Sequence, residues 1–294
     1  MGFRSTLLHL RFPFSFFLLP IWLAAVSAVP APDPGRTLAT FVILHLLLYP
    51  ASNGFNSYFD RDEGPIGGIA HPPPVGKDLL VAALALDFMA LLAGAALLGP
   101  LFVAGILLYG IASKLYSWDR TRLKARPIVS WLMIGAGQGA ITFLIVLSSV
   151  STSGPAGIGV SSALEALSAM ALLLGVYPLT QVYQHEEDGR RGDLTISRLV
   201  GILGTFALSG VFLGAGTLGF GAFVAMKGGP VWGAVYLAMQ LPAAIYFMTW
   251  FLRARRDAAS ADFKHAMVMN ILASGCLSFF FILRLAAGAF SNAV

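Results

Sequence analysis

Residues 49 to 64 read YPASNGFNSYFDRDEG, and residues 177 to 192 read YPLTQVYQHEEDGRRG. At a constant offset of 128 residues, the two lines are identical at Tyr49/Tyr177, Pro50/Pro178, Asp60/Asp188 and Gly64/Gly192. Three further pairs are chemically alike: Ser52/Thr180, Asn53/Gln181 and Asn56/Gln184. An internal repeat indicates an architecture built from similar units. We therefore predict a single domain over residues 1 to 294 with two half-sites, one in each half.

Each copy carries a polar stripe at the end of an apolar run. On a helix, Asn53, Asn56 and Asp60 lie at i, i+3 and i+7 and share one face. The second copy has the same spacing at Gln181, Gln184 and Asp188. Polar side chains in a membrane helix are costly and either face a cavity or hydrogen-bond to a neighbouring helix. Because both halves keep the spacing and the terminal acid, we favour one shared polar site over separate structural contacts.

The composition is that of a membrane protein. Of the 294 residues, 57% are hydrophobic and only 11% are charged, and the mean hydropathy is +0.78. A soluble domain carries about 25% charged residues. The single cysteine, Cys276, excludes a disulfide framework.

About 20 apolar residues are needed to cross the hydrocarbon core of a bilayer. By that measure we predict nine membrane-spanning helices, at residues 12–29, 38–58, 79–98, 100–116, 128–150, 162–183, 196–223, 231–252 and 265–288. The fold class is then all-α, a polytopic membrane bundle in which two parallel repeats surround a central cavity. The first span follows Arg4 and Arg11, so a cleaved signal peptide is the alternative interpretation of that segment. Its long apolar run, with Pro20 and Trp22, favours a retained helix.

The basic residues indicate the orientation of the bundle. With nine spans, the amino terminus and the loops after spans two, four, six and eight lie on one side of the membrane. That side holds every Lys and Arg except Arg36, Lys227 and Arg284, which predicts that it faces the cytoplasm. Both repeat copies open on the same side. Orientation explains the net charge of +5 and the pI near 9.5, and nucleic acid is not needed as a partner.

Acidic and basic residues on this side predict a site for a metal ion and a diphosphate. Carboxylate oxygens suit Mg²⁺, which proteins bind through one or two carboxylates plus the phosphates of a substrate. The candidate metal ligands are Asn56, Asp60, Asp62, Glu63 and Asp188. The most basic loop, residues 113–127, offers Lys114 and Arg122 as diphosphate donors, although orientation alone also explains its charge. Inside the membrane, Asp87 and Arg284 are further site candidates because ionisable groups are costly there.

Together these features resemble the UbiA superfamily of intramembrane prenyltransferases. The resemblance rests on the nine spans, on NGFNSYFDRDEG after span two, on EEDGRRGDLT after span six and on the basic loop YSWDRTRLKARP, and it covers nearly the whole chain. In that family, a motif close to N-x-x-x-D-x-x-x-D and a second close to D-x-x-x-D with a following G-x-x-T hold Mg²⁺ and a prenyl diphosphate. Asn56 and Asp60 match the first motif, and Asp188, Gly192 and Thr195 match the second.

The resemblance implies an integral, multi-pass membrane enzyme, in the inner membrane if the source is bacterial. It would transfer a prenyl group from a prenyl diphosphate to an acceptor, with Mg²⁺ as cofactor. The catalytic residues would be Asp60, Asp188 and Lys114. The substrate-binding residues would be Asn53, Asn56, Gln181, Gln184, Arg122, Tyr49 and Tyr177, the two tyrosines offering aromatic faces to an allylic cation. An aromatic quinone precursor is the commonest acceptor in the family, and a lipid is the other class considered.

Two positions depart from the family pattern. Gly64 stands where the first motif has its last acid, and Gln184 stands where the second has an aspartate. Asp62 and Glu63 are candidates to supply the missing charge in the first loop, as Glu187 and Asp193 are in the second. The departures also support an alternative function, a carrier or binding protein for an isoprenoid or lipid phosphate that has lost the chemistry.

Overall fold

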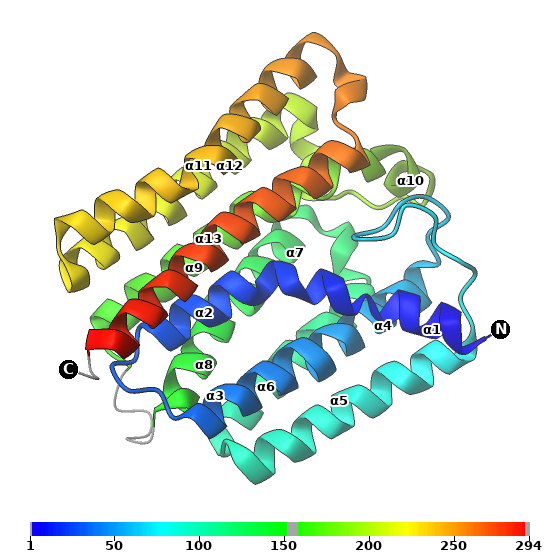
Figure 1. The fold of residues 1–294 in the computed structure, drawn as a ribbon. Coiled ribbons are helices and arrows are strands. Elements are labelled where there is room, and N and C mark those ends of the chain that lie inside the picture. Colours follow the sequence, from blue (N-terminus) through cyan, green and yellow to red (C-terminus); the bar gives the residue numbers. More distant parts are fainter. Residues whose placement is uncertain (1, 152–157, 292–294) are drawn as a thin grey trace.

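The structure is a computed structural model that describes residues 2–151 and 158–291. These residues are almost entirely helical and contain no strand beyond one isolated bridge between Ile66 and Ile69. Among them, the nine predicted spans are confirmed, at Phe3–Ser27, Pro34–Asp60, Lys77–Leu97, Pro100–Ser117, Pro127–Val150, Val160–Arg190, Ile196–Gly228, Pro230–Arg256 and Phe263–Gly288 (Figure 1). The fold class predicted from apolar length is therefore confirmed.

Four spans are single continuous helices: α5 (Lys77–Leu97), α6 (Pro100–Ser117), α12 (Pro230–Arg256) and α13 (Phe263–Ser291). Another, α11 (Ile196–Gly228), is kinked at Gly201, which has φ 72°. The other four spans are each broken into three pieces. The first span is α1 (Phe3–Leu10), η1 (Phe12–Leu18) and α2 (Leu19–Ser27), and the second is α3 (Pro34–Phe41), η2 (Val42–Leu48) and α4 (Tyr49–Asp60). The fifth span is α7 (Pro127–Ile134), η4 (Gly135–Ile141) and α8 (Thr142–Val150), and the sixth is α9 (Val160–Leu179), η6 (Val182–Gln184) and α10 (His185–Arg190). The short turns η3 (Leu123–Ala125) and η7 (Ala258–Ser260) lie between spans. All four broken spans line the central cavity, as expected because irregular backbone at membrane depth is tolerated where it lines a cavity.

Two tight hairpins follow from Gly-Pro pairs. Gly99 has φ 97° and precedes Pro100 at the start of α6, and Gly229 has φ 92° and precedes Pro230 at the start of α12. Glycine adopts positive φ without steric cost, and proline in the first turn of a helix sacrifices no hydrogen bond. The chain therefore reverses sharply between α5 and α6 and between α11 and α12, and each pair packs as a hairpin (Figure 1).

Two of the breaks, η2 and η4, are π-helical turns. A π turn adds one residue to the repeat of an α-helix and is frequent at functional sites. The first, η2, runs directly into α4 and carries His45, which is buried and hydrogen-bonds through Nδ1 to the Ser15 carbonyl at 3.1 Å. The orientation of the first repeat copy around its helix axis therefore depends on the π turn that precedes it.

Small residues bring the helices of the second half close together. A Cβ placed on Gly175 of α9 would lie 2.7 Å from the Leu213 backbone nitrogen, and one on Gly216 of α11 would lie 2.8 Å from that of Leu172. Membrane helices associate through such close backbone contacts because lipid gives them no hydrophobic driving force. The long α11 is thereby held against α9, which leads into the second repeat copy.

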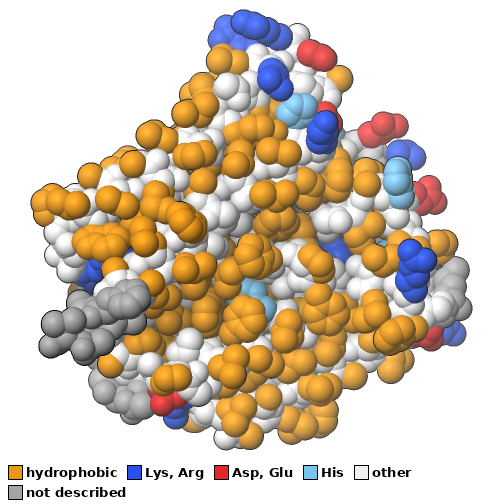
Figure 2. All heavy atoms as spheres, in the orientation of Figure 1, with side chains coloured by type: hydrophobic (Ala, Val, Ile, Leu, Met, Phe, Trp, Pro, Cys, Tyr) orange, Lys and Arg blue, Asp and Glu red, His pale blue; other side chains and the backbone are white. Residues whose placement is uncertain are grey.

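The first span, for which a signal peptide was the alternative interpretation, packs inside the bundle. Helix α2 contacts α8 and α13, and most of its side chains are buried. Hydrophobic side chains cover most of the face in Figure 2, while Lys, Arg, Asp and Glu gather along its upper and right-hand margins. The upper margin is the connection between α12 and α13, and α10 and the loop of residues 61–76 lie toward the right (Figure 1). The region made by α10, the loop of residues 61–76 and the loop of residues 118–126 is here called the motif end.

Candidate active site

A cavity of about 230 Å³ opens at the motif end between the two halves. The polar residues of both repeat copies line it, as predicted. They are Tyr49, Asn53, Asn56, Asp60, Asp62, Tyr177, Gln181, Gln184 and Asp188. The carboxylates of Asp60 and Asp188 both interact electrostatically with the Tyr116 hydroxyl on α6, which also lines the cavity. The repeat therefore brings two acidic half-sites to one space.

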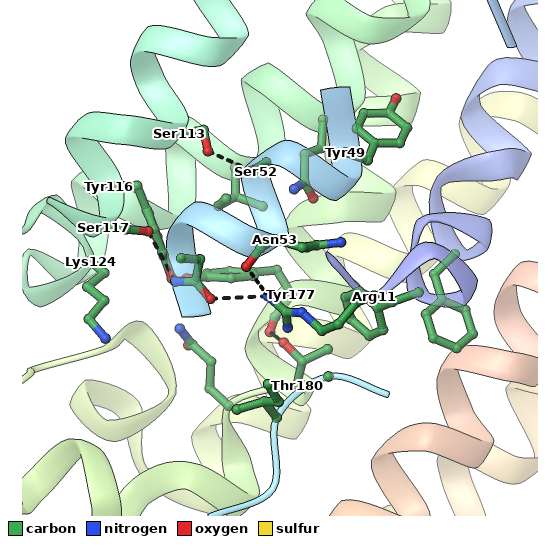
Figure 3. Close-up of a pocket in the computed structure, with 18 of the residues that line it drawn as sticks. Arg11, Tyr49, Ser52, Asn53, Ser113, Tyr116, Ser117, Lys124, Tyr177 and Thr180 are labelled. Atoms are coloured by element: carbon green, nitrogen blue, oxygen red, sulfur yellow. Dashed lines mark hydrogen bonds between the residues drawn. The ribbon is translucent and has the colours of Figure 1, made fainter. Parts of the chain in front are cut away.

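The first copy forms a regular helical stripe. Helix α4 carries Asn53, Asn56 and Asp60 on the side that faces the cavity, and Asn53 is labelled there in Figure 3. The Asn56 amide donates to Asp60 Oδ2 at 2.5 Å and to Ser117 Oγ at 3.1 Å. Arg61 then ends the helix in the left-handed conformation, with φ 48°. The amide of Asn56 thus orients the carboxylate that ends the stripe.

The second copy is not one continuous helix, and that part of the sequence prediction is wrong. Helix α9 ends at Leu179, and the chain passes through η6 before α10. Pro178 lacks the N–H that would bond to the Leu174 carbonyl. Instead, Trp131 Nε1 on α7 donates to that carbonyl at 2.8 Å. The break still directs Gln181, Gln184 and Asp188 into the cavity.

The tyrosines and glutamines of the motifs hold the cavity wall together. The hydroxyl groups of Tyr177 and Tyr116 lie 2.5 Å apart. Gln181 Oε1 accepts from the Ser197 backbone N–H at 3.3 Å, and Gln184 Nε2 donates to the Pro65 carbonyl at 3.3 Å. Gln184, which stands in place of a motif aspartate, therefore ties the second copy to the loop of the first.

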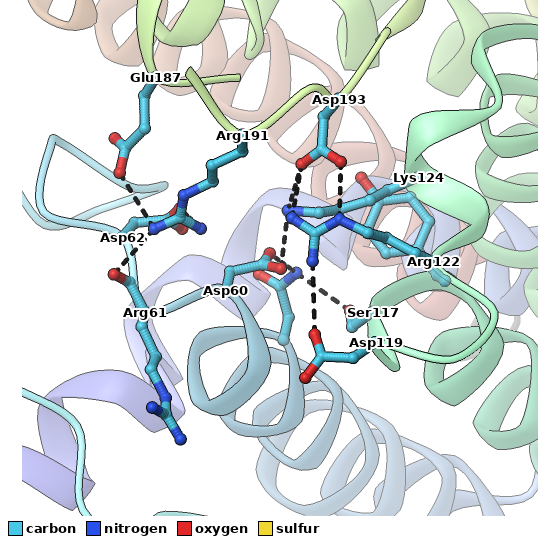
Figure 4. A network of polar contacts seen from close by, with 12 residues as sticks. Asp60, Arg61, Asp62, Ser117, Asp119, Arg122, Lys124, Glu187, Arg191 and Asp193 are labelled. Atoms are coloured by element: carbon cyan, nitrogen blue, oxygen red, sulfur yellow. Dashed lines mark hydrogen bonds and ion pairs between the residues drawn. The ribbon is translucent and has the colours of Figure 1, made fainter. Parts of the chain in front are cut away.

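Lys124 joins the two copies through an ion-pair network (Figure 4). Its Nζ lies 2.7 Å from Asp60 Oδ1 and 3.3 Å from Asp193 Oδ2, and its side chain is only 8% exposed. Arg122 holds Asp193 from the other side, with Nε and Nη2 donating to the two carboxylate oxygens at 2.7 and 2.8 Å. Burial lowers the pKa of Lys124, but the charges of Asp60 and Asp193 outweigh it and the pKa is raised. Lys124 is thus a protonated cation between the motifs.

Arg11 places a second cation in the cavity. It sits in the left-handed conformation (φ 49°) between α1 and η1 and is 8% exposed. Nη2 donates to the Asn53 carbonyl and to Asn56 Oδ1, both at 3.2 Å (Figure 3). Among the described residues it forms no ion pair, and its Nε has no hydrogen-bond partner. A buried guanidinium without a carboxylate partner is costly, so Arg11 presents unneutralised charge to a ligand in the cavity.

The two cations predicted from the sequence lie elsewhere. Lys114 pairs with Asp87 inside the membrane and lies 5.2 Å from the centre of the Phe55 ring. Arg122 is committed to Asp193. Neither lines the cavity. From the sequence, Arg11 was interpreted as an orientation signal, and Lys124 belonged to the basic loop from which Lys114 and Arg122 were chosen as diphosphate donors.

The loop after α4 is closed by the second copy. Glu187 accepts the backbone N–H groups of Glu63 and Gly64 at 3.0 and 3.1 Å. A Cβ on Gly64 would lie 2.6 Å from Glu187 Oε2. A side chain at position 64 would therefore require the Glu187 carboxylate to move and to give up these two hydrogen bonds. Glu63 contributes its backbone, and its exposed side chain does not line the cavity as predicted for a metal ligand.

Asp62 is the remaining acid of the first loop. Arg191 Nη1 lies 2.9 Å from its Oδ1. Burial, followed by the charge of Asp60, raises the pKa of Asp62 from 3.8 to about 6. Two carboxylates that disfavour each other's ionisation in one cavity attract a cation.

The donors in the cavity fit a hard divalent cation. In the described part of the chain, no three His, Cys, Asp or Glu side chains converge on one point. Mg²⁺ does not need such a cage, because it keeps waters and takes its remaining ligands from substrate phosphates. Asp60 and Asp188 from opposite walls, with Asp62 and Asn56 beside them, supply oxygen donors of this kind.

Comparison with known proteins places this cavity in a family. The sequence model of the UbiA prenyltransferase family matches residues 17–273. The chain belongs to the UbiA prenyltransferase family. Members of the family are intramembrane prenyltransferases, so the predicted membrane class and the predicted type of reaction, prenyl transfer, are confirmed. A search of curated proteins found no match.

Solved structures share the fold at low sequence identity. A UbiA homolog from Archaeoglobus fulgidus bound to GPP and Mg²⁺ has a TM-score of 0.69 and 15% identity, with 96% of this chain and 99% of that chain covered. The apo structure of a UbiA homolog from Aeropyrum pernix K1 has a TM-score of 0.67 and 16% identity, with 97% and 99% covered. A structure of digeranylgeranylglyceryl phosphate synthase has a TM-score of 0.61 and 15% identity, with 95% and 97% covered. These matches confirm the fold over nearly the whole chain.

Proposed function

We propose that the whole chain is one Mg²⁺-dependent prenyltransferase domain. It transfers a prenyl group from a prenyl diphosphate to an aromatic or lipid acceptor at the motif end, which faces the cytoplasm. The observation that carries this proposal is the joint presence, in one cavity, of Asp60 and Asp188 from the two repeat copies and of the cations Arg11 and Lys124. Acids for a metal ion and cations for phosphates are the two requirements for holding a diphosphate.

The cavity has a polar end and an apolar wall. Phe17, Leu18, Met133, Ile134 and Leu173 line it together with the charged groups. Apolar side chains would hold the isoprenoid tail, while the aromatic faces of Tyr49 and Tyr177 would face an allylic cation. Related UbiA structures contain GPP with Mg²⁺, which supports the same donor class and cofactor here.

The metal ion would be held by Asp60 and Asp188, with Asn56 and Asp62 beside them. Bound there, Mg²⁺ offsets the negative charge that develops on a leaving diphosphate. Arg11 and Lys124 would add fixed positive charge on the same group, where preorganised donors act most strongly in a site that excludes water. Arg11 and Lys124 line the cavity, so they replace Lys114 and Arg122 as the proposed diphosphate donors.

The proposed orientation rests on the distribution of charge. Every Lys and Arg except Arg36, Lys227 and Arg284 lies at the amino terminus, in the loops or in the adjoining helix ends on the side of the motif end. Cytoplasmic loops carry such an excess of basic residues. Cysteine-accessibility mapping of residues 61–76 and 229–230 in spheroplasts or oriented vesicles would check it.

Prenyl transfer is tested with purified protein in nanodiscs, with geranyl diphosphate as donor and a panel of aromatic and lipid acceptors. We expect product that requires Mg²⁺ and is reduced at least about 100-fold in Asp188→Asn, since metal-held phosphoryl sites lose several kcal/mol without a ligand. Glu186→Gln is the matched control, because Glu186 is on the same helix and 89% exposed. No product with any acceptor, or equal product in both variants, would contradict the proposal.

A binding protein without catalysis is the second candidate, favoured by Gly64 and Gln184 at positions where the family motifs carry acids. Calorimetric titration with geranyl diphosphate separates the two functions. Binding that needs Mg²⁺ without turnover for any acceptor would favour the carrier. Binding with turnover favours the enzyme.

A further inference from the structure

Asp60 is the central metal ligand of the proposed function, yet both of its oxygens are occupied by groups of the chain itself. Oδ2 accepts from the Asn56 amide, and Oδ1 lies 2.7 Å from Lys124 Nζ. The side chains of Asp60 and Lys124 are only 5% and 8% exposed. A divalent cation at Asp60 would therefore share a buried space with an ammonium group.

Two positive charges do not stay in contact in a buried site unless further carboxylates separate them. Asp193 is shared between two cations, because Arg122 donates to both of its oxygens at 2.7 and 2.8 Å and Lys124 Nζ lies 3.3 Å from its Oδ2. Asp193 consequently keeps a cation partner if Lys124 moves away. Lys124 lines the cavity and has a flexible four-carbon stem, so it can turn toward a ligand there.

We infer that Lys124 is an exchangeable cation, an inference that rests on the proposed function. Without a divalent ion, Lys124 neutralises Asp60. When Asp60 takes a divalent ion, Lys124 leaves that carboxylate and binds the diphosphate. The same side chain thus competes with the metal for Asp60 and assists the binding of the substrate anion.

This exchange gives Lys124→Met opposite effects on two affinities. Loss of the competing ammonium should make Mn²⁺ bind about tenfold more tightly in the absence of diphosphate. Loss of the phosphate donor should make a prenyl thiolodiphosphate, an analogue that resists cleavage, bind about tenfold more weakly at saturating Mn²⁺. A lysine with a purely structural role would not change the two affinities in opposite directions.

The experiment measures free Mn²⁺ by electron paramagnetic resonance and analogue binding by calorimetry, with the full-length protein in detergent. Lys77→Met is the matched control, because Lys77 is exposed at the start of α5 and does not line the cavity. Lys124→Arg keeps the charge and should retain most of the analogue affinity. Opposite shifts in Lys124→Met alone support the inference; unchanged affinities, or two affinities that fall together, overturn it.

Lys124→Met leaves Asp60 without its cation and could fold poorly, so Lys124→Gln provides a second neutral variant with a hydrogen-bond donor. For both, the rise in melting temperature on adding Mn²⁺ should exceed that of the wild type, because binding to the native state stabilises it in proportion to affinity. A smaller rise in both overturns the inference. Wild-type protein that binds neither Mn²⁺ nor the analogue overturns the proposed function together with the exchange, whereas normal wild-type binding with silent variants overturns the exchange alone.

Discussion

Asp60→Asn is expected to lower the free energy of unfolding, whereas Asp188→Asn is expected to leave it nearly unchanged. The two acids occupy matched positions in the repeat, so the sequence alone gives no reason for a difference. In the structure, Asp60 forms an ion pair with Lys124 at 2.7 Å. Asp188 accepts only a long hydrogen bond from Thr195 at 3.4 Å and forms no ion pair within the described residues. The two acids therefore have similar proposed roles in the site but are expected to contribute differently to the free energy of unfolding.

The magnitude follows from the burial of the pair. Removing one partner of a buried ion pair costs about 3–5 kcal/mol. Lys124 keeps a second carboxylate, Asp193, at 3.3 Å, so we expect about half of that cost, roughly 2 kcal/mol, for Asp60→Asn. For Asp188→Asn no cation loses its partner, and the change should stay within about 0.5 kcal/mol.

The assay is unfolding in detergent with a chelator present, followed by tryptophan fluorescence, because a bound divalent ion would stabilise the wild type selectively. Glu186→Gln, on the same helix as Asp188, is the control for the loss of one acid at the motif end. If Asp188→Asn were as unstable as Asp60→Asn, or if Asp60→Asn were as stable as the wild type, the ion pair would not carry the stability assigned to it.

Arg11→Gln should raise the Kd for geranyl diphosphate at least about tenfold, because a charge-assisted hydrogen bond is worth about 1.5–3 kcal/mol; unchanged affinity by calorimetry would remove Arg11 from the site. Lys114→Gln should leave that Kd unchanged and lower the melting temperature, because Asp87 loses its ion-pair partner; weaker binding would restore the sequence-based assignment. The pKa of Asp62 is raised from 3.8 to about 6, so its protonated form favours the folded state, and this stabilisation is complete below pH 3.8 and lost as the pH rises through about 6. Asp62→Asn should therefore flatten the melting temperature between pH 4 and 6 relative to the wild type, and an unchanged slope in pH-dependent melts would contradict that origin.

The bundle and the first repeat copy could be predicted because they depend on local patterns. Apolar length gave the nine spans, and the spacing of Asn53, Asn56 and Asp60 gave the stripe that faces the cavity. The break after Leu179 could not be predicted in the same way. Pro50 stands at the matched position and α4 continues past it, whereas at Pro178 the freed Leu174 carbonyl is bound by Trp131, far away in the sequence.

The choice of cations also depends on the fold. Arg122 and Lys124 are two residues apart in one basic loop, and nothing local distinguishes them. Arg122 adopts a left-handed conformation with φ 40°, and the η3 turn that follows places Lys124 in the cavity. Arg11 reaches the same cavity as Lys124 from another span, through the turn between α1 and η1. Which charges share a cavity is a property of the packed helices.

The π turn η2 gives the first motif a fixed phase around its helix. Successive residues of an α-helix are about 100° apart, and a π turn takes up about one residue more than an α turn, so regular α-helix over all seven residues of Val42–Leu48 would rotate everything after it by about that angle relative to α3. Asn53, Asn56 and Asp60 would then point away from the opposing acids, although every one of them would still be present. Closing the π turn to α-helix without changing the number of residues, in an apolar stretch remote from any charged group, would thus separate the two halves of the site as completely as the loss of a ligand.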